Sequence, residues 1–185
     1  MKDTTTLLRR ALWNHFGAAI DTFRAQISLC GDPVWEREKK IGYLCYHVSI
    51  FLDYYLSAPV RDFRPALPYT LADPDHLPPE AIDDVLPARA YSRKEMLDWL
   101  DAVRSRCRKL ILQSTDADFS APWIQPEEVD LHGLCPDLVV NYSRLEILLY
   151  NLRHLQHHVG QLNLLLRQHL GQAADWLALP ENEAP

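Results

Sequence analysis

Apolar residues at steps of three and four are the feature of this chain that most limits its possible folds. One such stripe runs through residues 4–30, and its members are Leu8, Leu12, Phe16, Ala19, Phe23 and Ile27. This spacing places them on one face of an α-helix, which must be buried against other elements. The same pattern predicts helices over residues 33–57, 92–114 and 143–170. Because no alternating strand pattern occurs between them, we expect an all-α protein, a four-helix bundle.

Two capping motifs mark the starts of the third and fourth helices. Ser92 precedes Glu95 by three residues, and Ser143 precedes Glu146 in the same way. In such a capping box the serine and glutamate side chains each bond the other's backbone N–H, which satisfies free groups of the first turn.

The connections between the predicted helices differ greatly in length. Helices 4–30 and 33–57 nearly adjoin, so we expect them to be antiparallel neighbours. Residues 58–91 contain seven of the chain's 13 prolines and cannot be helical. A connection this long either covers the mouth of a site or spans the bundle, in which case the third helix runs parallel to the second. Residues 115–142 form a second irregular segment, and we expect Trp123 to pack it onto the helices.

Length and composition favour one soluble domain. With 185 residues, 48% of them hydrophobic and 24% charged, residues 1–185 are expected to form a single domain. The sequence contains neither a secretion signal nor roughly 18 consecutive apolar residues, so we expect a cytoplasmic protein without a membrane partner. In the tail that follows the fourth helix, Trp176 is a candidate to dock on the helices.

Charge and cysteine usage exclude further classes. The net charge is −6, and a groove that follows phosphates needs far more positive surface, so we expect no nucleic-acid partner. The four cysteines occur singly, without the close pairs of a zinc knuckle or a redox motif, and are expected to be reduced thiols.

Three histidines interrupt the leucine-rich pattern of the fourth predicted helix. His154 and His158 are four residues apart and therefore lie about 40° apart on one face, on the same bearing as Ile147 and Leu165. Both imidazoles can point at one atom inside the protein. His157 lies on the polar side of the same helix.

His47 is the candidate partner of this pair. It lies in the second predicted helix on a face with Tyr43, Phe51 and Tyr54. Taken alone, a histidine on such a face is more often a neutral core residue bonded to a carbonyl or a tyrosine hydroxyl. Three imidazoles are nevertheless a frequent ligand set of mononuclear metal sites that keep positions open for water or substrate.

Two interpretations of the histidines remain open from spacing alone. In the first, the second and fourth helices face each other with His47, His154 and His158 at one height, and the three bind a metal ion. In the second, the histidines near residue 157 form a solvated strip and His47 is buried separately, because His-x-x-x-His is a weak motif without its structural context.

Other catalytic motifs are missing from the sequence. It has no Glu-x-x-His for a di-iron bundle, no His-Glu-x-x-His, no Gly-x-Ser-x-Gly and no glycine-rich phosphate loop, so no organic cofactor is expected. No general base can be assigned, and the catalytic residues stay unknown. Asp53 points away from His47 on the helix, and Glu95 and Asp98 approach the histidines only if the third helix is suitably rotated.

The histidine pattern resembles that of a known family. His47 in the second helix, together with His-x-x-His-His-x-Gly-Gln-Leu at residues 154–162 and Arg167 after it, resembles the DinB/YfiT-like metalloenzymes. The resemblance spans nearly the whole chain, including the helix order and the long connection before the serine-capped helix. It implies an up-down-down-up bundle, a homodimer, and a divalent metal ion, zinc or nickel, bound by His47, His154 and His158.

Such a site implies metal-dependent chemistry on a small molecule. Three neutral imidazoles leave the charge of a divalent ion uncompensated, so the ion is a strong Lewis acid that favours an anionic further ligand. We therefore expect a hydrolase or a transferase that uses a low-molecular-weight thiol, with an unknown substrate. The competing class is a non-catalytic metal-binding or stress-related protein with the same bundle.

Overall fold

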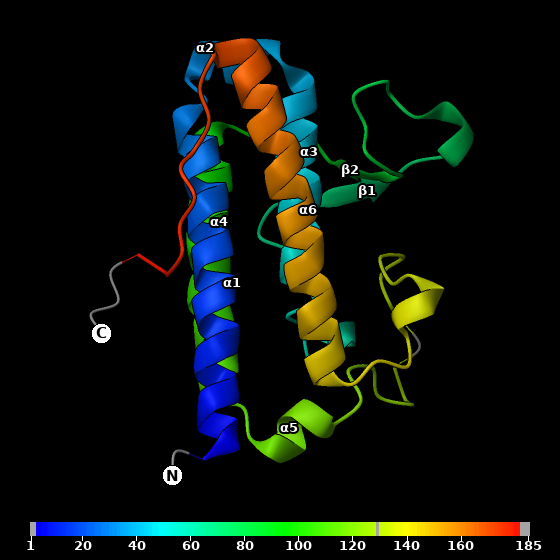
Figure 1. Cartoon of the computed structure of the whole chain (residues 1–185). Helices are drawn as coiled ribbons and strands as arrows, with labels where there is room; N and C mark the ends of the chain where they lie inside the picture. The colour runs from blue at the N-terminus through cyan, green and yellow to red at the C-terminus, as the bar shows by residue number, and fades with distance from the viewer. Residues whose placement is uncertain (1–2, 129, 182–185) are drawn as a thin grey trace.

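Four long helices make up most of the molecule, in a computed structural model that describes residues 3–128 and 130–181. They are α1 (Thr4–Leu29), α3 (Lys39–Tyr54), α4 (Arg93–Gln113) and α6 (Arg144–Leu170). Helix α1 packs against α4 and α6, and α3 packs against the same two helices (Figure 1). In Figure 1, α1 and α6 rise along the long axis of the molecule, whereas α3 and α4 descend. The predicted all-α character is confirmed.

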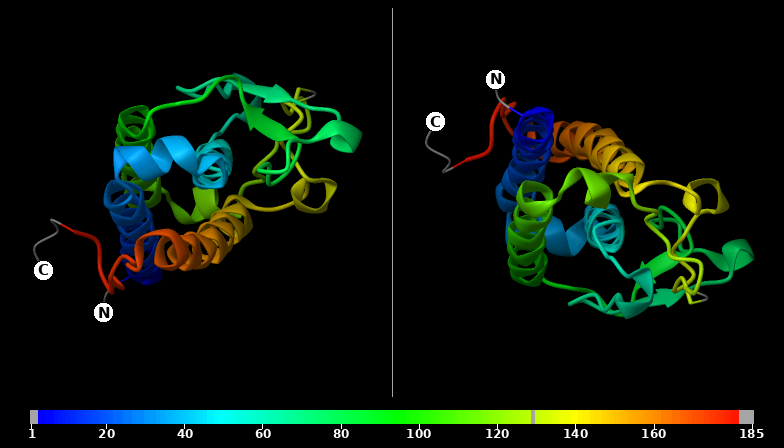
Figure 2. Two further views of the ribbon diagram at one scale, coloured as in Figure 1. Left: turned by 90° about the horizontal axis from the view of Figure 1, so that it is seen from above. Right: turned by 90° about the horizontal axis from the view of Figure 1, so that it is seen from below.

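The second predicted helix is divided in two, which corrects the expected span of 33–57. Helix α2 (Asp32–Arg37) ends before Glu38, whose ψ of 73° is not helical, and α3 ends at Tyr54. The indole N–H of Trp35 donates to the carbonyl of Tyr91 at 3.0 Å. This contact ties α2 to the segment before α4, so the short helix crosses from α1 toward α3 at one end of the molecule (Figure 2). The apolar period cannot encode such a contact.

The proline-rich connection contains a small two-stranded sheet, which the sequence analysis did not predict. Strand β1 (Tyr69–Leu71) pairs antiparallel with β2 (Val85–Pro87). Strands of three residues are too short to show an alternating pattern in the sequence. Next to β1, the carbonyl of Pro68 accepts from the hydroxyls of Tyr46 and Tyr91, each at 2.8 Å. These bonds fasten the sheet beside α3.

The second irregular segment is partly ordered by local caps. Its one α-helix among the described residues, α5 (Asp116–Ser120), begins with a capping box between Thr115 and Asp118 that the sequence interpretation missed. The boxes at Ser92 and Ser143 are confirmed. Trp123 is buried, with its indole N–H 3.0 Å from the carbonyl of Ser57, so it packs the segment onto the helices as predicted.

The tail after α6 returns beside α1 and α4 (Figure 1). It is held by Pro180, which sits against Gly17 so closely that a Cβ there would lie 2.6 Å from the proline ring, and by the Glu181 N–H, which donates to Asp21 at 2.8 Å. Trp176, the expected anchor, is 76% exposed. Among the described residues, no helix has the length and apolar character needed to cross a membrane.

Candidate metal centre

The three histidines singled out by spacing converge between α3 and α6. His47 comes from the middle of α3, and His154 and His158 lie one turn apart on α6. The Nε2 atom of His47 is 3.0 Å from that of His154 and 3.1 Å from that of His158, and the latter two are 3.1 Å apart. We refer to these residues as the histidine trio.

Buried amides fix the height of α6 against its neighbours. The Asn151 side chain donates to the carbonyl of Leu52 on α3 at 3.1 Å, and Gln26 of α1 donates to the carbonyl of Val159 at 2.8 Å. Both side chains are fully buried, so sliding α6 by one turn would leave polar groups unpaired. These bonds bring the two histidines of α6 level with His47.

The nitrogen triangle fits a metal ion better than a hydrogen-bond network. An imidazole Nε2 either carries a proton or offers a lone pair, so three mutually adjacent Nε2 atoms cannot all be paired with one another. A cation among three lone pairs removes this conflict. Two nitrogens bound about 2.1 Å from one ion lie about 3.0 to 3.4 Å apart for angles between square and tetrahedral, which matches the trio.

Burial keeps the α6 histidines neutral. Removal from water, followed by the neighbouring His47, lowers the pKa of His154 to about 3 and that of His158 to about 4. Because both values lie well below neutral pH, each imidazole retains a lone pair for an ion.

Gln161 orients one ligand candidate. Nδ1 of His158 lies 2.7 Å from the Gln161 side-chain oxygen, which accepts its proton and leaves the lone pair on Nε2. The Gln161 amide in turn lies 3.1 Å from Nε2 of His157 and donates to it. His157 itself is exposed, on the polar side of the helix as predicted, and it supports the trio from outside.

Asp83 contacts His47 and was missed by sequence reasoning. Its Oδ2 lies 3.0 Å from Nδ1 of His47, an ion-pair distance at which the angle does not meet hydrogen-bond geometry. Its other oxygen accepts from the Val85 N–H at 3.1 Å, which holds the carboxylate in place. Nδ1 of His154 is buried without a hydrogen-bond partner among the described residues. No local sequence pattern predicts this role of Asp83, because only the path of the proline-rich connection brings the residue to α3.

A cavity of about 300 Å³ opens beside His47 and His154. Both irregular segments line it, so they shape the approach to the trio. Its other walls consist of aromatic rings, two carboxylates and one thiol, contributed by Phe51, Tyr55, Tyr150, Asp83, Asp84 and Cys135 among others. Within residues 3–128 and 130–181, the lining includes neither lysine nor arginine. Burial raises the pKa of the Cys135 thiol, which is therefore protonated at neutral pH.

The carboxylates weighed as general bases lie elsewhere. Asp53 accepts from the indole of Trp99 at 2.9 Å and pairs with Arg106, consistent with its expected direction away from His47. Glu95 belongs to the α4 cap, and Asp98 pairs with Lys94 at 2.6 Å on the surface.

Tyr43 and Tyr54, which the helical period places on the same face as His47, do not line the cavity beside the trio. The hydroxyl of Tyr54 donates to the carbonyl of Leu131, and Tyr43 lines a different cavity. Tyr55 faces the cavity beside the trio instead. Tyr55 directly follows α3 with a φ of −70° and a ψ of −10°, so it continues the helical rotation one step beyond Tyr54.

Fold and site together define a mostly helical protein with a buried three-histidine cluster able to hold a metal ion. A family model described as DinB superfamily matches residues 38–162, from just before α3 through both histidines of α6. The chain belongs to the DinB superfamily. No curated protein and no solved structure matches it significantly.

Proposed function

We propose that this protein is a divalent-metal-dependent enzyme, a hydrolase or a thiol-dependent transferase acting on a small molecule, with His47, His154 and His158 as its metal ligands. The observation that carries the proposal is the convergence of three Nε2 atoms at 3.0 to 3.1 Å beside a cavity. A divalent ion held by neutral imidazoles supplies Lewis-acid chemistry, since its charge is not compensated by the ligands. Zinc and nickel both suit an imidazole set.

The protein's own residues prepare this site. Gln161 holds the tautomer of His158, and the Asp83 carboxylate lies beside His47, as supporting partners of metal-bound histidines commonly do. The aromatic walls suit an apolar or flat part of a substrate. With Asp83 and Asp84 in the lining and no lysine or arginine there, the cavity favours a neutral or ammonium-bearing substrate over a polyanion.

The architecture supports the same assignment. The pairwise contacts of α1, α3, α4 and α6 and their directions support an up-down-down-up four-helix bundle, which is the topology that we propose. A single domain over residues 1–185, a homodimer and a cytoplasmic location stay predictions of the sequence.

Metal analysis tests the ligand set. Protein purified without an affinity tag should contain about one equivalent of a divalent metal, and His154→Ala should lose it. His76→Ala is the matched control, because His76 is exposed and, among the described residues, its side chain pairs only with Asp73. Absence of stoichiometric metal from the parent protein, or an unchanged metal content in His154→Ala, would show that the histidine trio is not a metal site.

Turnover separates the enzyme from the alternative of a non-catalytic metal-binding protein. The metal-loaded protein should act on at least one member of a panel of esters, amides and thiol–electrophile pairs, and His154→Ala should not. Full metal content without turnover across the panel would favour the binding protein.

A further inference from the structure

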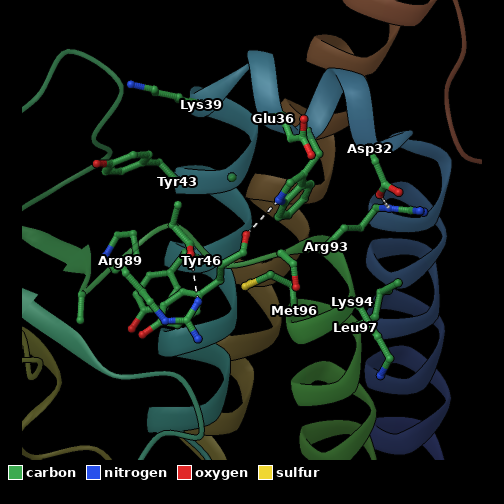
Figure 3. Close-up of a pocket in the computed structure, with 17 residues that line it drawn as sticks. Asp32, Glu36, Lys39, Tyr43, Tyr46, Arg89, Arg93, Lys94, Met96 and Leu97 are labelled. Atoms are coloured by element: carbon green, nitrogen blue, oxygen red, sulfur yellow. Dashed lines mark hydrogen bonds and ion pairs between the residues drawn. The ribbon is translucent and has the colours of Figure 1, made fainter.

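A second and larger cavity lies beside the N-terminal end of α3. It has a volume of about 1000 Å³ and is bounded by α2, the start of α3, residues 87–92 and the start of α4 (Figure 3). None of the histidine trio lines it. We call it the upper cavity, and the one beside the trio the histidine cavity.

Gly42 leaves the backbone of α3 open at the wall of the upper cavity. A Cβ placed on this residue would meet no atom within 4 Å. Glycine inside a helix is less stable than alanine, and here no neighbouring side chain requires it. Its absent side chain instead leaves space for a flat group to lie directly against the helix.

Aromatic rings surround this opening and are held in place. The rings of Tyr46 and Tyr91 stack at 5.6 Å, and the indole of Trp35 is tethered to the Tyr91 carbonyl. Tyr43 follows Gly42 and extends from α3 toward the 87–92 segment (Figure 3). Its hydroxyl makes no hydrogen bond within the described residues. Flat rings in such an arrangement favour an aromatic ligand.

The lining carries more positive than negative charge, although the chain is acidic. Four cationic and two anionic side chains line the upper cavity. The cations are Lys39, Arg89, Arg93 and Lys94, and the carboxylates are Asp32 and Glu36. Three of these cations are engaged, since Arg89 pairs with Glu95, Arg93 with Asp32 and Lys94 with Asp98.

Lys39 is the cation left over. It makes no ion pair with any described residue, it is exposed, and it extends on the same side of α3 as Tyr43, with Arg89 on the facing segment (Figure 3). An anionic group on a ligand therefore has a cation available one turn from Gly42. The carboxylate of Glu36 is also in the lining and makes no ion pair with a described residue, so the site offers one cation and little excess positive charge. Without a glycine-rich loop of N–H donors, such a site suits a monovalent carboxylate better than a phosphate.

We propose that the upper cavity binds a small aromatic carboxylate, with its ring against the Gly42 backbone beside Tyr43 and its carboxylate at Lys39. This is a ligand site separate from the histidine trio. Its occupant differs in charge from the substrate favoured by the histidine cavity.

Calorimetric titration with naphthoate tests the proposal. Naphthoate should bind saturably, and Lys39→Gln should raise its Kd about tenfold, the cost of one charge-assisted contact. Gly42→Val, which fills the opening, should abolish the binding. Gly160→Val is the matched control, because a Cβ on this mid-helix glycine also meets nothing within 4 Å and Gly160 lies outside the upper cavity.

Further arms identify the ligand chemistry and the place of binding. Naphthalenemethanol should bind more weakly than naphthoate, adenosine monophosphate should not bind more tightly, and His154→Ala should leave the naphthoate Kd unchanged. A loss of binding in His154→Ala would place the carboxylate at the trio and overturn the proposal. Tighter binding of the alcohol or the nucleotide would overturn the assigned class.

Folding of the variants is checked by circular dichroism. If Gly42→Val does not fold, Gly42→Ala and Lys39→Gln carry the test, and both should weaken naphthoate. Unchanged Kd values in both, or no saturable binding to the parent protein, would overturn the site.

Discussion

The two cavities share a helix and a connecting segment but carry opposite charge. Both are bordered by α3, and both take residues from the region around β2. Asp83 and Asp84, which precede this strand in the sequence, line the histidine cavity. Arg89, which follows the strand, lines the upper cavity. One short stretch of chain thus directs carboxylates to one cavity and a guanidinium to the other.

Two cavities along one helix can therefore favour ligands of different charge. His47 and Tyr43 are one helical turn apart on α3, yet one belongs to the trio and the other to the upper cavity. Local charge, more than the net charge of −6, decides what each cavity accepts.

The largest expected effect on ligand binding comes from substituting His47 and Tyr43 one at a time. His47→Ala should lower metal affinity by more than the about 10- to 100-fold that loss of a supporting partner costs, because a direct ligand is removed. It should leave the naphthoate Kd unchanged. Tyr43→Ala should weaken naphthoate and leave the metal content intact. Competitive metal titration and calorimetry measure both, and a variant that impairs both cavities equally would show that they are one site.

A smaller effect is expected at Asp83. Asp83→Asn removes the charge beside Nδ1 of His47 and should reduce metal affinity by about 10- to 100-fold, as for other supporting carboxylates. Asp73→Asn is the control within the same connection, since Asp73 is exposed and, in the part of the chain that the structure describes, bonds only residues of its own turn. Equal metal affinity in both variants would mean that the Asp83 contact does not support the ligand.

The helical framework and the pairing of two histidines were predictable because both follow from the 3.6-residue period. The bounds expected for α1, α4 and α6 differ from the observed ones by one residue at most at each end. His154 and His158 share a face for the same reason. That His47 lies level with them depends on packing, through bonds such as that of Asn151 to Leu52, and no sequence period encodes this height.

The parts that escaped prediction are those set by distant contacts. The break at Glu38 accompanies the docking of Trp35 on Tyr91, and Asp83 reaches His47 only because the proline-rich connection folds back beside α3. Helix α5 is a different case, since its capping box from Thr115 to Asp118 is visible in the sequence.

The walls of both cavities are fastened by buried indoles, and their removal should cost moderate stability. Trp35→Phe deletes the bond to the Tyr91 carbonyl, and Trp123→Phe deletes the bond to the Ser57 carbonyl. Each should lower the free energy of unfolding by about 1 to 3 kcal/mol, because a buried acceptor is left unpaired. Urea unfolding measures the loss. We expect only Trp35→Phe to change the naphthoate Kd. A changed Kd in both variants would contradict the conclusion that the two indoles support different cavities.

The smallest effect is expected at Glu95, which holds Arg89 at the edge of the upper cavity. Its bond with Arg89, followed by those with Ser92, lowers the pKa of Glu95 from 4.5 to about 2. Because the folded-state pKa is the lower one, the stabilisation is present above the unfolded value of 4.5 and is lost as pH falls through about 2. The thermal midpoint of Glu95→Gln should therefore lie below that of the parent protein at neutral pH, and the difference should shrink toward the acid end.

Glu127→Gln is the control for this substitution, since Glu127 is exposed and makes no hydrogen bond or ion pair with another described residue. The same substitution at Glu95 should also release the Arg89 guanidinium toward the upper cavity. Naphthoate should then bind about two- to threefold more tightly at neutral pH, an effect limited by the solvent exposure of this ion pair. A constant difference in thermal midpoint across the pH range would show that the cap does not depend on the charge of Glu95. Weaker naphthoate binding would show that Arg89 acts on the ligand only while Glu95 positions it.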